Sequence, residues 1–491
     1  MSKAHPFVLA VDVGTSALKI VLYSREGRSI AAAVERYGYL APAPGQAEAD
    51  PETWWDALMR AAAQLHESGF DLSSLSFIAV TGQMHTAVLL DEKVNVIAPT
   101  ILWLDRRASA ETAELQKTLG LPPYQLNSTY TLPRLLWLYR HLPEVIKKVR
   151  HILWPKDYLR YRLTGEIITD RTEAGGAALL NWETLDWAKD RLKLAGLSPS
   201  VLPPFGDPAE PGGTLTSKAA EQLNLPAGLP VLIGTGDVLA LVTAAPPKPG
   251  RVTCSLGSSS MVFYPMTGEK DYSDPQGRIY EYPLLPYPLL GGVSSTTGAS
   301  LKWAIQTMFD KNAVYETVIN ETLQTEPGSD GLVFLPFLSG ERSPFWSDTL
   351  SGGFYGLRLS HTRSHMVRAV LEGVAFSLRY LLDIYRELGV PVDEIALAGG
   401  GIETPGWPQI FANICRMPVT IYAGQETVTH GLYAYACLAD GESSFQEALS
   451  RTFLEPVQIA PDEQWGELYD KSYLQYSALT NFASQNLAEK C

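Results

Sequence analysis

The sequence predicts an α/β protein built from two domains. Its 491 residues exceed the size that one hydrophobic core usually supports, about 250–300 residues. Short apolar strands alternate with helical segments of roughly 15 residues, a pattern typical of α/β sheets. The Pro- and Gly-rich stretch APPKPG at 245–250 lies midway along the chain and has the composition of a linker. We therefore expect one domain over 1–245 and a second over 246–491.

The first domain is expected to open with a β-hairpin. Val8–Val13 has the composition of a buried strand, Leu18–Tyr23 that of a returning strand, and Gly-Thr-Ser forms the polar tip between them. A helix should begin after Asp50-Pro51, a capping residue followed by a proline suited to the first turn, and end at Gly69. Three segments follow: LSFIAVTGQMHTAVLLD as strand, turn and strand, IITDRTEAGGAALLNWET as a loop rich in small residues, and PVLIGTGDVLALV as a strand, a glycine-bracketed turn and a helix.

The second domain is expected to repeat the hairpin. CSLGSSSMVFYP has the same order as VDVGTSALKIVLY, namely an apolar strand, a small polar tip that begins with Gly, and a returning strand. Because the pattern occurs only twice and far apart, it indicates one hairpin per domain rather than a solenoid. Residues 360–389 predict a long helix with an apolar stripe, and VDEIALAGGG predicts a strand that runs into a glycine triplet.

Composition and charge exclude several classes of function. Apolar residues make up 46% of the chain and charged residues 19%, as in ordinary soluble proteins. The net charge of −14 argues against non-specific binding to nucleic acid or to an anionic membrane, although a glycine-rich loop or a metal can still bind phosphate locally. Four cysteines without framework spacing, no signal peptide and no long apolar run predict a cytoplasmic protein without a membrane span, and a homodimer is compatible with the sequence.

Asp237 is the most informative residue, because its carboxylate interrupts an apolar run just after Gly234 and Gly236. A carboxylate among apolar side chains has a raised pKa and persists when it is paired, bound to a metal or functional. The alternative is a helix N-cap, since a helix is expected to begin here. The two interpretations are compatible.

The two hairpin tips, Gly14–Ser16 and Gly257–Ser259, are candidates for phosphate binding. Glycine lets backbone N–H groups approach a phosphate, and hydroxyls add donors. Lys19 would add a point charge, and Asp12 would hold Mg²⁺ beside the phosphates. Each tip alone is more typical of a tight turn, and Asp12 alone could equally bond turn amides. The matched pair favours phosphate binding, because two facing tips would form a clamp.

Other candidate motifs are weaker. The triplet AGGG at 398–401 is by itself most often a turn, and neither a Walker A motif, a dinucleotide fingerprint nor zinc-ligand spacing occurs in the chain. His85 in TGQMHT is a lone histidine, and such residues are more often structural than ligands.

Together these motifs resemble the FGGY carbohydrate kinases, within the sugar kinase, Hsp70 and actin superfamily. The resemblance runs essentially from end to end, and its strongest piece is GGFYGLRLSHTRSHMVRAVLEG at 352–373, which fits the family's second signature. The supporting pieces are GQMH (82–85), ILWLDRRA (101–108), TLPRLLWLYRHLPE (131–144), PKDYLRYRLTGE (155–166), GTGD (234–237), FLPFLSGERSP (334–344) and AGGG (398–401).

The resemblance implies a fold, an activity and a set of site residues. It implies two RNase H-like domains flanking a catalytic cleft, the first binding mainly sugar and the second mainly ATP, with Mg²⁺ as the metal. Asp237 would be the general base that deprotonates the attacking hydroxyl. The implied sugar-binding residues are Gln83, Met84, His85, Asp105, Arg106, Asp237 and Val238. The implied ATP-binding residues are Gly14, Thr15, Ser16, Lys19, Gly257, Ser258, Ser259, Gly298, Lys302, Gly400, Gly401 and Thr404, and the implied metal-binding residues are Asp12 and Asp237.

Several positions depart from the family pattern. Val238 and Leu104 stand where Asn is typical, Arg134 stands where Lys is usual, and HGLYAY at 430–435 replaces a small Ala/Gly stretch on the nucleotide side. GQMH and its spacing to LWLDRR resemble the xylulose-phosphorylating members, which implies D-xylulose as substrate and D-xylulose 5-phosphate as product. GERSPFW (340–346) and NWETLDW (181–187) are more similar to the gluconate kinases, so gluconate, or another ketose or polyol, is the alternative.

Two other classes of function remain as alternatives at this stage. One is a non-catalytic relative that binds sugar or nucleotide, and the other is an Hsp70-like or actin-like ATPase that acts on a protein partner. Retention of Asp12, Lys19 and Asp237 favours an enzyme over the first, and the FGGY-type signature disfavours the second.

Overall fold

The computed structural model describes residues 6–244, 247–266, 272–282, 288–310, 313–421, 427–450 and 456–486. Cys491 and residues 245 and 246 of the predicted linker lie outside this part of the chain. The chain divides into two compact units, one formed by Met1–Pro246 with Glu426–Phe453 and the other by Pro247–Gln425 with Leu454–Cys491. The first boundary falls within APPKPG. Residues 426–453 group with the first unit, whereas the expected second domain covers all of 246–491.

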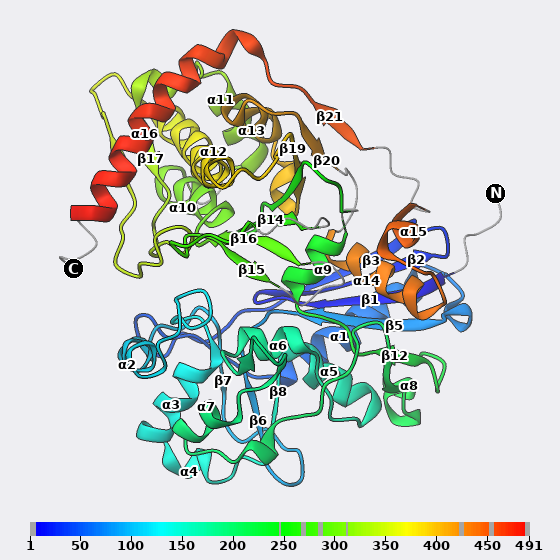
Figure 1. Ribbon diagram of the computed structural model, residues 1–491. Helices are drawn as coiled ribbons and strands as arrows, with labels where there is room; N and C mark the ends of the chain where they lie inside the picture. Colours follow the sequence, from blue (N-terminus) through cyan, green and yellow to red (C-terminus); the bar gives the residue numbers. More distant parts are fainter. Residues whose placement is uncertain are drawn as a thin grey trace. The chain divides into compact units, whose positions relative to one another are not determined.

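The first unit is built around a six-stranded sheet of order β11-β12-β5-β1-β2-β3 (Figure 1). Strands β1, β5 and β12 are parallel, and β2, β3 and β11 are antiparallel to their neighbours. Its strands are β1 (Pro6–Val13), β2 (Ala17–Ser24), β3 (Ser29–Arg36), β4 (Glu48–Ala49), β5 (Phe77–Gly82), β6 (Val88–Leu90), β7 (Thr100–Ile101), β8 (His151–Leu153), β9 (Leu180–Asn181), β10 (Asp186–Trp187), β11 (Pro211–Thr214) and β12 (Pro230–Leu232). Its helices are α1 (Glu52–Glu67), η1 (Leu72–Ser74), α2 (Ser109–Leu119), α3 (Thr131–His141), α4 (Pro143–Ile146), α5 (Pro155–Thr164), α6 (Arg171–Gly176), α7 (Lys189–Leu194), η2 (Pro199–Val201), α8 (Ser217–Leu223), α9 (Asp237–Thr243), α14 (Thr427–Ala439) and α15 (Phe445–Ser450).

Strand β1 is buried on both faces, which is why its sequence is an apolar run rather than an alternation. Leu9, Val11 and Val13 pack into the core cluster that contains side chains of α1, α5 and α8. Val8 and Ala10 pack into the opposite cluster, which contains side chains of α14. The predicted hairpin is confirmed, and so is the helix after Asp50, whose carboxylate accepts a hydrogen bond from the Glu52 N–H (3.0 Å) at the start of α1.

Helix α14 returns to the first unit from far along the sequence. It contacts β1, β5 and α9, and Tyr23 of β2 bonds Thr429 across 406 residues of chain (2.9 Å). A β-carbon on Gly431 would lie 1.7 Å from the Ala240 carbonyl oxygen, so α14 and α9 are in backbone contact. His430 stacks on Tyr433 within this core (5.5 Å between ring centroids), and burial lowers the pKa of His430 to about 4. The HGLYAY departure therefore fills the core of the first unit.

The second unit repeats the strand order of the first. Its sheet has the order β15-β16-β14-β13-β19-β20-β21, in which the β13–β14 hairpin corresponds to β1–β2, and β19 and β20 run parallel to β13 as β5 and β12 run parallel to β1. Its strands are β13 (Arg251–Ser255), β14 (Ser260–Pro265), β15 (Tyr280–Tyr282), β16 (Leu289–Ser294), β17 (Val333–Leu335), β18 (Gly353–Tyr355), β19 (Glu394–Ala398), β20 (Val419–Ile421) and β21 (Val457–Ile459). Its helices are α10 (Gly298–Met308), α11 (Tyr315–Leu323), η3 (Ser329–Gly331), α12 (Arg363–Glu387), η4 (Gly400–Glu403), α13 (Trp407–Cys415), η5 (Glu463–Trp465) and α16 (Gly466–Asn486).

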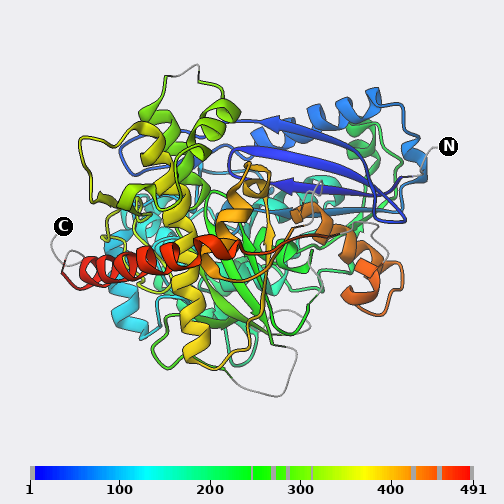
Figure 2. The ribbon, with the colours of Figure 1, turned by 90° about the horizontal axis from the view of Figure 1, so that it is seen from above.

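The long helix predicted over 360–389 is α12. Thr362 and His365 form a capping box at its start, and Gly389 with φ 72° follows its end. Helix α16 crosses α12, as Figure 2 shows, and both pack into the core of the second unit.

The segment predicted as a small-residue loop contains a short helix, so that prediction is wrong. Helix α6 begins after Asp170, whose carboxylate accepts a hydrogen bond from the Thr172 N–H (3.1 Å). This cap offsets the poor helix propensity of Gly175 and Gly176.

Candidate active site

The GTGD loop runs beside the carboxyl end of β5, and steric contacts account for both of its glycines. Gly234 has φ 69°, and a β-carbon there would lie 1.9 Å from the Val80 carbonyl oxygen. A β-carbon on Gly236 would lie 2.5 Å from the Met84 sulfur. Gly236 also bridges Gly82, and the Thr81 hydroxyl donates to the Thr235 carbonyl (2.6 Å). The loop is thus held against β5 by backbone contacts. A side chain at Gly234 would meet the β5 backbone, and a side chain at Gly236 would displace the Met84 side chain.

Asp237 is the first residue of α9, and Gly236 is the N-cap. The predicted N-cap role is therefore replaced by a local contact, in which Asp237 Oδ1 accepts a hydrogen bond from the Val238 N–H (2.8 Å). Burial, followed by the negative charge of Asp12, raises the pKa of Asp237 to about 7. A carboxylate with this pKa is poised to exchange a proton near neutral pH.

Met84 and His85 form a wall beside this loop. His85 has a left-handed backbone (φ 69°), and its carbonyl accepts hydrogen bonds from Thr131 and from Arg134 Nη2 (2.6 Å for Arg134). Its Nδ1 lies 2.6 Å from the Gly176 carbonyl oxygen. Because a carbonyl can only accept, Nδ1 carries a proton, and a neutral ring then presents Nε2 as an acceptor.

Arg134, which departs from the family pattern by replacing Lys, holds the backbone of His85. Its guanidinium is buried and donates to the carbonyls of His85, Thr129 (2.9 Å) and Ser128 (3.3 Å). Burial lowers the pKa of Arg134 to about 9. The forked guanidinium thus fixes the backbone on which His85 stands.

The first hairpin tip is connected to the same wall. Thr15 donates to Gln83 Oε1 (3.0 Å) and accepts from the Trp103 indole N–H (2.9 Å). Strand register places Asp12 between Lys19 of β2 on one side and Thr81 of β5 on the other. Tyr37 donates to the Gly14 carbonyl (2.6 Å). Asp12, the tip, Gln83 and the GTGD loop therefore share one end of the β2-β1-β5-β12 strands, with Ser16 exposed at the tip.

Asp105 and Arg106 lie on the loop after β7. Asp105 is fully buried, and its two oxygens accept hydrogen bonds from the backbone N–H groups of Ala47 (2.6 Å) and Arg107 (2.8 Å) and from the Arg107 guanidinium. Arg106 donates to the Trp103 carbonyl (3.3 Å). In this structure the Asp105 carboxylate holds the loop together.

The second hairpin tip packs on the start of α10. The Gly257 and Ser258 carbonyls accept hydrogen bonds from the first backbone N–H groups of the helix, at distances of 2.8 Å for Gly298 and 3.1 Å for Ala299. A β-carbon on Gly298 would lie 2.6 Å from the Gly257 carbonyl oxygen, which accounts for this glycine. Ser259 completes the tip, and Lys302 of α10 is exposed.

The glycine triplet follows β19. Gly399 has φ 83°, and Gly401 lies against Leu256, since a β-carbon there would be 2.5 Å from the Leu256 Cβ. Gly400 is exposed, and a β-carbon there would meet no described atom within 4 Å. Thr404 hydrogen-bonds Tyr315 (2.9 Å). Of the three glycines in the triplet, Gly400 is therefore the one whose neighbours leave room for a side chain.

The predicted residues fall into two groups, one in each unit. Asp12, Lys19, the Gly14 tip, the GQMH segment and Asp237 are brought together in the first unit. Gly257–Ser259, Gly298 and Gly401 are brought together in the second unit. Other residues, which are not among the predicted site residues, hydrogen-bond the backbone and side chains of the predicted site, namely Tyr37, Trp103, Thr131, Arg134, Asp170, Thr172 and Gly176.

Asp12 and Asp237 are the carboxylates that could take a divalent cation. Within the described ranges, no group of three or more His, Cys, Asp or Glu side chains could hold a metal ion. Mg²⁺ usually takes one or two protein carboxylates and completes its shell with water and substrate phosphates. Asp12 lies close enough to Asp237 to add to the effect of burial on the pKa of Asp237, and two neighbouring carboxylates fit that mode of binding.

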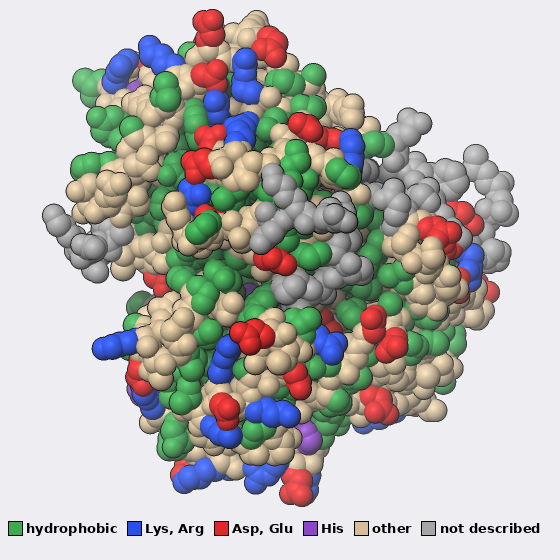
Figure 3. Space-filling model, in the orientation of Figure 1, with side chains coloured by type: hydrophobic (Ala, Val, Ile, Leu, Met, Phe, Trp, Pro, Cys, Tyr) green, Lys and Arg blue, Asp and Glu red, His purple; other side chains and the backbone are tan. Residues whose placement is uncertain are grey.

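Neither the charge on the drawn face nor any helix of the described residues indicates a nucleic-acid interface or a membrane span. The face drawn in Figure 3 has Lys and Arg side chains interspersed with Asp and Glu, so it presents no broad basic field. In the part of the chain that the structure covers, no helix has both the length and the apolar composition that crossing a bilayer requires.

Comparisons with known proteins identify the family of the chain. Residues 7–243 match the N-terminal domain, and residues 252–439 the C-terminal domain, of the FGGY family of carbohydrate kinases. The chain is 32% identical over 465 residues to the xylulose kinase of Escherichia coli, covering 93% of this chain and 95% of that protein.

Solved structures of sugar kinases have the same fold as this chain. A ligand-bound xylulose kinase from Lactobacillus acidophilus superposes with a TM-score of 0.87 at 25% identity, covering 99% of this chain and 100% of that one. A gluconate kinase from the same organism superposes with a TM-score of 0.86 at 25% identity, with 99% of both chains covered. The predicted two-domain α/β kinase fold is confirmed, and the chain belongs to the FGGY family of carbohydrate kinases, enzymes that phosphorylate a sugar hydroxyl.

Proposed function

We propose that this kinase transfers the γ-phosphoryl group of ATP to a hydroxyl of D-xylulose, giving D-xylulose 5-phosphate, with Asp237 as the general base. The observation that carries the proposal is the environment of Asp237. Its carboxylate is partly desolvated, has a pKa of about 7, and lies on a loop packed against Met84. A base with a pKa near the working pH combines the ionised state with a strong affinity for the hydroxyl proton.

The sugar side of the site would be formed by the first unit. We assign His85 Nε2 as an acceptor for a sugar hydroxyl, Gln83 as a polar contact, and Met84 and Val238 as an apolar wall. Asp105 is assigned to ordering the loop that carries Arg106, because its oxygens are already engaged by Ala47 and Arg107.

The ATP side would use backbone and hydroxyl donors. Gly14, Thr15, Ser16 and Lys19 of the first unit are assigned to the transferred phosphate, and Gly257, Ser258 and Ser259 of the second to the other phosphates. Gly298, Lys302, Gly400, Gly401 and Thr404 are assigned to the nucleotide. Asp12, with Asp237, would hold Mg²⁺, which neutralises the charge that develops on the phosphoryl oxygens.

Gluconate is the second candidate substrate, supported by the structural likeness to a gluconate kinase. A carboxylate substrate needs a cationic partner, and Arg106 beside Trp103 is the candidate. A ketose needs neutral hydrogen-bond partners and an apolar wall, which His85, Met84 and Val238 supply without that cation. The identity of 32% to a named xylulose kinase over most of the chain also favours D-xylulose.

A kinetic screen tests the proposal. ADP release would be measured with D-xylulose, D-ribulose, L-ribulose, D-gluconate, glycerol and erythritol, and D-xylulose should give the highest kcat/KM. Asp237→Asn should lower kcat by roughly 10²–10⁴-fold with sugar binding retained. If gluconate exceeds D-xylulose more than tenfold and Arg106→Ala removes that preference, the xylulose assignment is wrong.

A further inference from the structure

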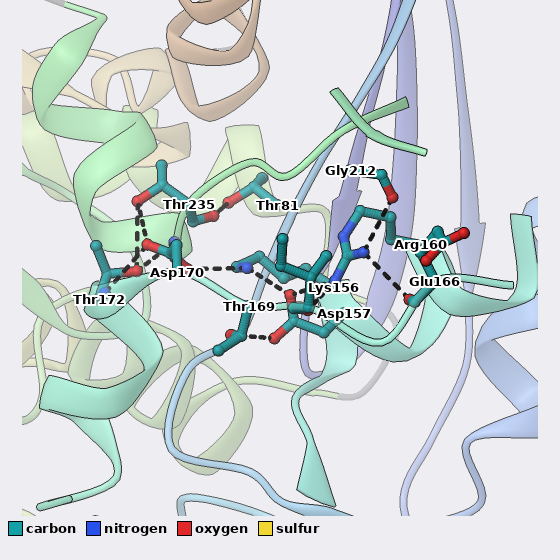
Figure 4. A network of polar contacts seen from close by, with 12 residues as sticks. Thr81, Lys156, Asp157, Arg160, Glu166, Thr169, Asp170, Thr172, Gly212 and Thr235 are labelled. Carbon is teal, nitrogen blue, oxygen red and sulfur yellow. Dashed lines mark hydrogen bonds and ion pairs between the residues drawn. The ribbon is translucent and has the colours of Figure 1, made fainter. Parts of the chain in front are cut away.

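A cluster of five buried ionisable side chains lies in the first unit, next to the GTGD loop, and the proposed function uses none of them. Lys156, Asp157, Arg160, Asp170 and Glu173 are all fully buried, and Figure 4 shows the first four of them. Burying a charge is costly unless it is paired and hydrogen-bonded. The charges in this cluster must therefore be paired or neutralised.

The charges of the first four residues, Lys156, Asp157, Arg160 and Asp170, cancel one another through ion pairs. Lys156 Nζ lies 2.7 Å from Asp157 Oδ1 and 2.9 Å from Asp170 Oδ1, and Arg160 Nη2 lies 3.3 Å from Asp157 Oδ1. Glu173 would add an unbalanced negative charge. Burial raises the pKa of Glu173 well above its usual range, and its two oxygens have no hydrogen-bond partner in the described part of the chain. A neutral Glu173 leaves two cations and two anions.

The cluster ends at the backbone of the GTGD loop. Asp170, fixed by Lys156, caps α6 by accepting from the Thr172 N–H through Oδ2 (3.1 Å). The Thr172 hydroxyl oxygen accepts a hydrogen bond from the Gly236 N–H (3.0 Å), and the Thr235 hydroxyl lies 3.4 Å from it. Figure 4 shows this chain of contacts running from Lys156 to Thr235. Gly236 is the residue directly before Asp237.

The C-terminal end of α6 contacts His85, the proposed acceptor for a sugar hydroxyl. The Gly176 carbonyl accepts from His85 Nδ1 (2.6 Å), and a β-carbon on Gly176 would lie 2.9 Å from that nitrogen. One short helix thus contacts the loop of the proposed base through Thr172 and the proposed sugar ligand through Gly176. The helix is anchored by the Lys156–Asp170 ion pair rather than by its own weak propensity.

We infer that Thr172 is a positioning residue for Asp237, held in place by the buried Lys156–Asp170 pair, and the inference rests on the proposed role of Asp237 as base. The Thr172 hydroxyl fixes the Gly236 N–H and therefore the entry of the chain into α9. Without it the buried N–H has no acceptor, the loop shifts, and the carboxylate leaves the geometry that proton transfer needs. Displacements of about 1 Å at a reacting group cost on the order of 10²-fold in rate.

The test compares isosteric substitutions of two threonines that hydrogen-bond members of the cluster, Thr172 to Asp170 and Thr169 to Asp157. Thr172→Val removes the hydroxyl that holds Gly236. Thr169→Val is the matched control, because the Thr169 hydroxyl donates to Asp157 (2.6 Å), and within the described residues its backbone bonds Pro204 and Gly206 rather than the GTGD loop. Both variants should lose similar thermal stability. Thr172→Val should lower kcat by about 10–100-fold with an unchanged KM for ATP, Thr169→Val should stay within about twofold of wild type, and Thr172→Ser should restore most of the activity.

The outcomes separate the inference from the proposed function. Equal kcat losses in the two valine variants, or wild-type kcat in Thr172→Val, would overturn the positioning role. If Thr172→Val does not fold, Thr172→Ala and Thr169→Ala are compared by the same criteria. Asp237→Asn is assayed in parallel: a nearly inactive Asp237→Asn with a fully active Thr172→Val refutes only the positioning role, whereas an active Asp237→Asn refutes the base assignment itself.

Discussion

Asp12 and Asp237 lie close enough in the first unit for the charge of one to act on the other. Burial is the larger cause of the raised pKa of Asp237, and the negative charge of Asp12 is the second. The two residues come from different elements, Asp12 from the end of β1 and Asp237 from the start of α9. Their proximity, together with burial, gives Asp237 a pKa suited to a general base and places two carboxylates where they could bind a cation. The effect of the raised pKa on catalysis and on stability can be measured.

The first prediction concerns the pH dependence of catalysis. Asp237 must be ionised to accept a proton, so kcat/KM for the sugar should fall tenfold per pH unit below an apparent pKa near 7. An unperturbed aspartate would give no such limb above about pH 5. The measurement is an ADP-release assay from pH 5 to pH 9, with coupling enzymes in excess at every pH. A flat profile down to pH 5 would contradict the raised pKa.

The same carboxylate should make folding stability depend on pH. Its pKa in the folded chain, about 7, lies above the value near 4 expected in the unfolded chain, so the unfolded chain releases the proton first as pH rises. Wild-type stability should therefore decline between about pH 4 and pH 7 relative to Asp237→Asn, which cannot ionise. The Tm of the variant minus that of wild type should be near zero at pH 4 and reach a plateau above pH 7. A difference that is constant across this range would count against the assignment.

The third prediction concerns Arg134, which holds the backbone of His85. Arg134→Lys keeps the charge but cannot serve three carbonyls from a planar fork. The KM for the sugar should rise by about 3–10-fold while the KM for ATP stays unchanged, because unsatisfied carbonyls let the His85 loop move. Arg150→Lys is the matched control, since Arg150 donates to the carbonyls of Lys147 and Val149 at the surface. Equal effects in both variants would remove the special role of Arg134.

Local patterns in the sequence predicted the elements that carry the site. Each of these elements depends on residues adjacent in sequence, such as Gly234 and Gly236 around a sharp turn. They are the two hairpins, the strand and helix around GTGD, and the strand before the glycine triplet. Helix α6 was missed because Gly175 and Gly176 lower its propensity. A signal was present, since Asp170 and Glu173 have the spacing of a capping residue and an acidic residue three positions later.

The residues that hold the site could not be predicted, because their partners are distant in sequence. Arg134 bonds the His85 carbonyl across 49 residues, and Thr172 bonds the Gly236 N–H across 64. The place of α14 in the first unit depends on contacts such as Tyr23 to Thr429. No periodicity or spacing encodes such pairs, which arise only when the sheets are assembled.

The glycine triplet offers the last test, because two adjacent glycines there are glycine for different reasons. Gly401 has no room for a side chain, since a β-carbon would lie 2.5 Å from the Leu256 Cβ, whereas Gly400 faces open space. Gly401→Ala should therefore destabilise the fold by about 1–3 kcal/mol through overpacking. Gly400→Ala should leave Tm unchanged and raise the KM for ATP several-fold, because in the proposed site its backbone approaches the nucleotide. Thermal unfolding and ATP titrations of the two variants separate these effects, and a Gly400→Ala variant with wild-type ATP kinetics would show that the nucleotide does not lie against this residue.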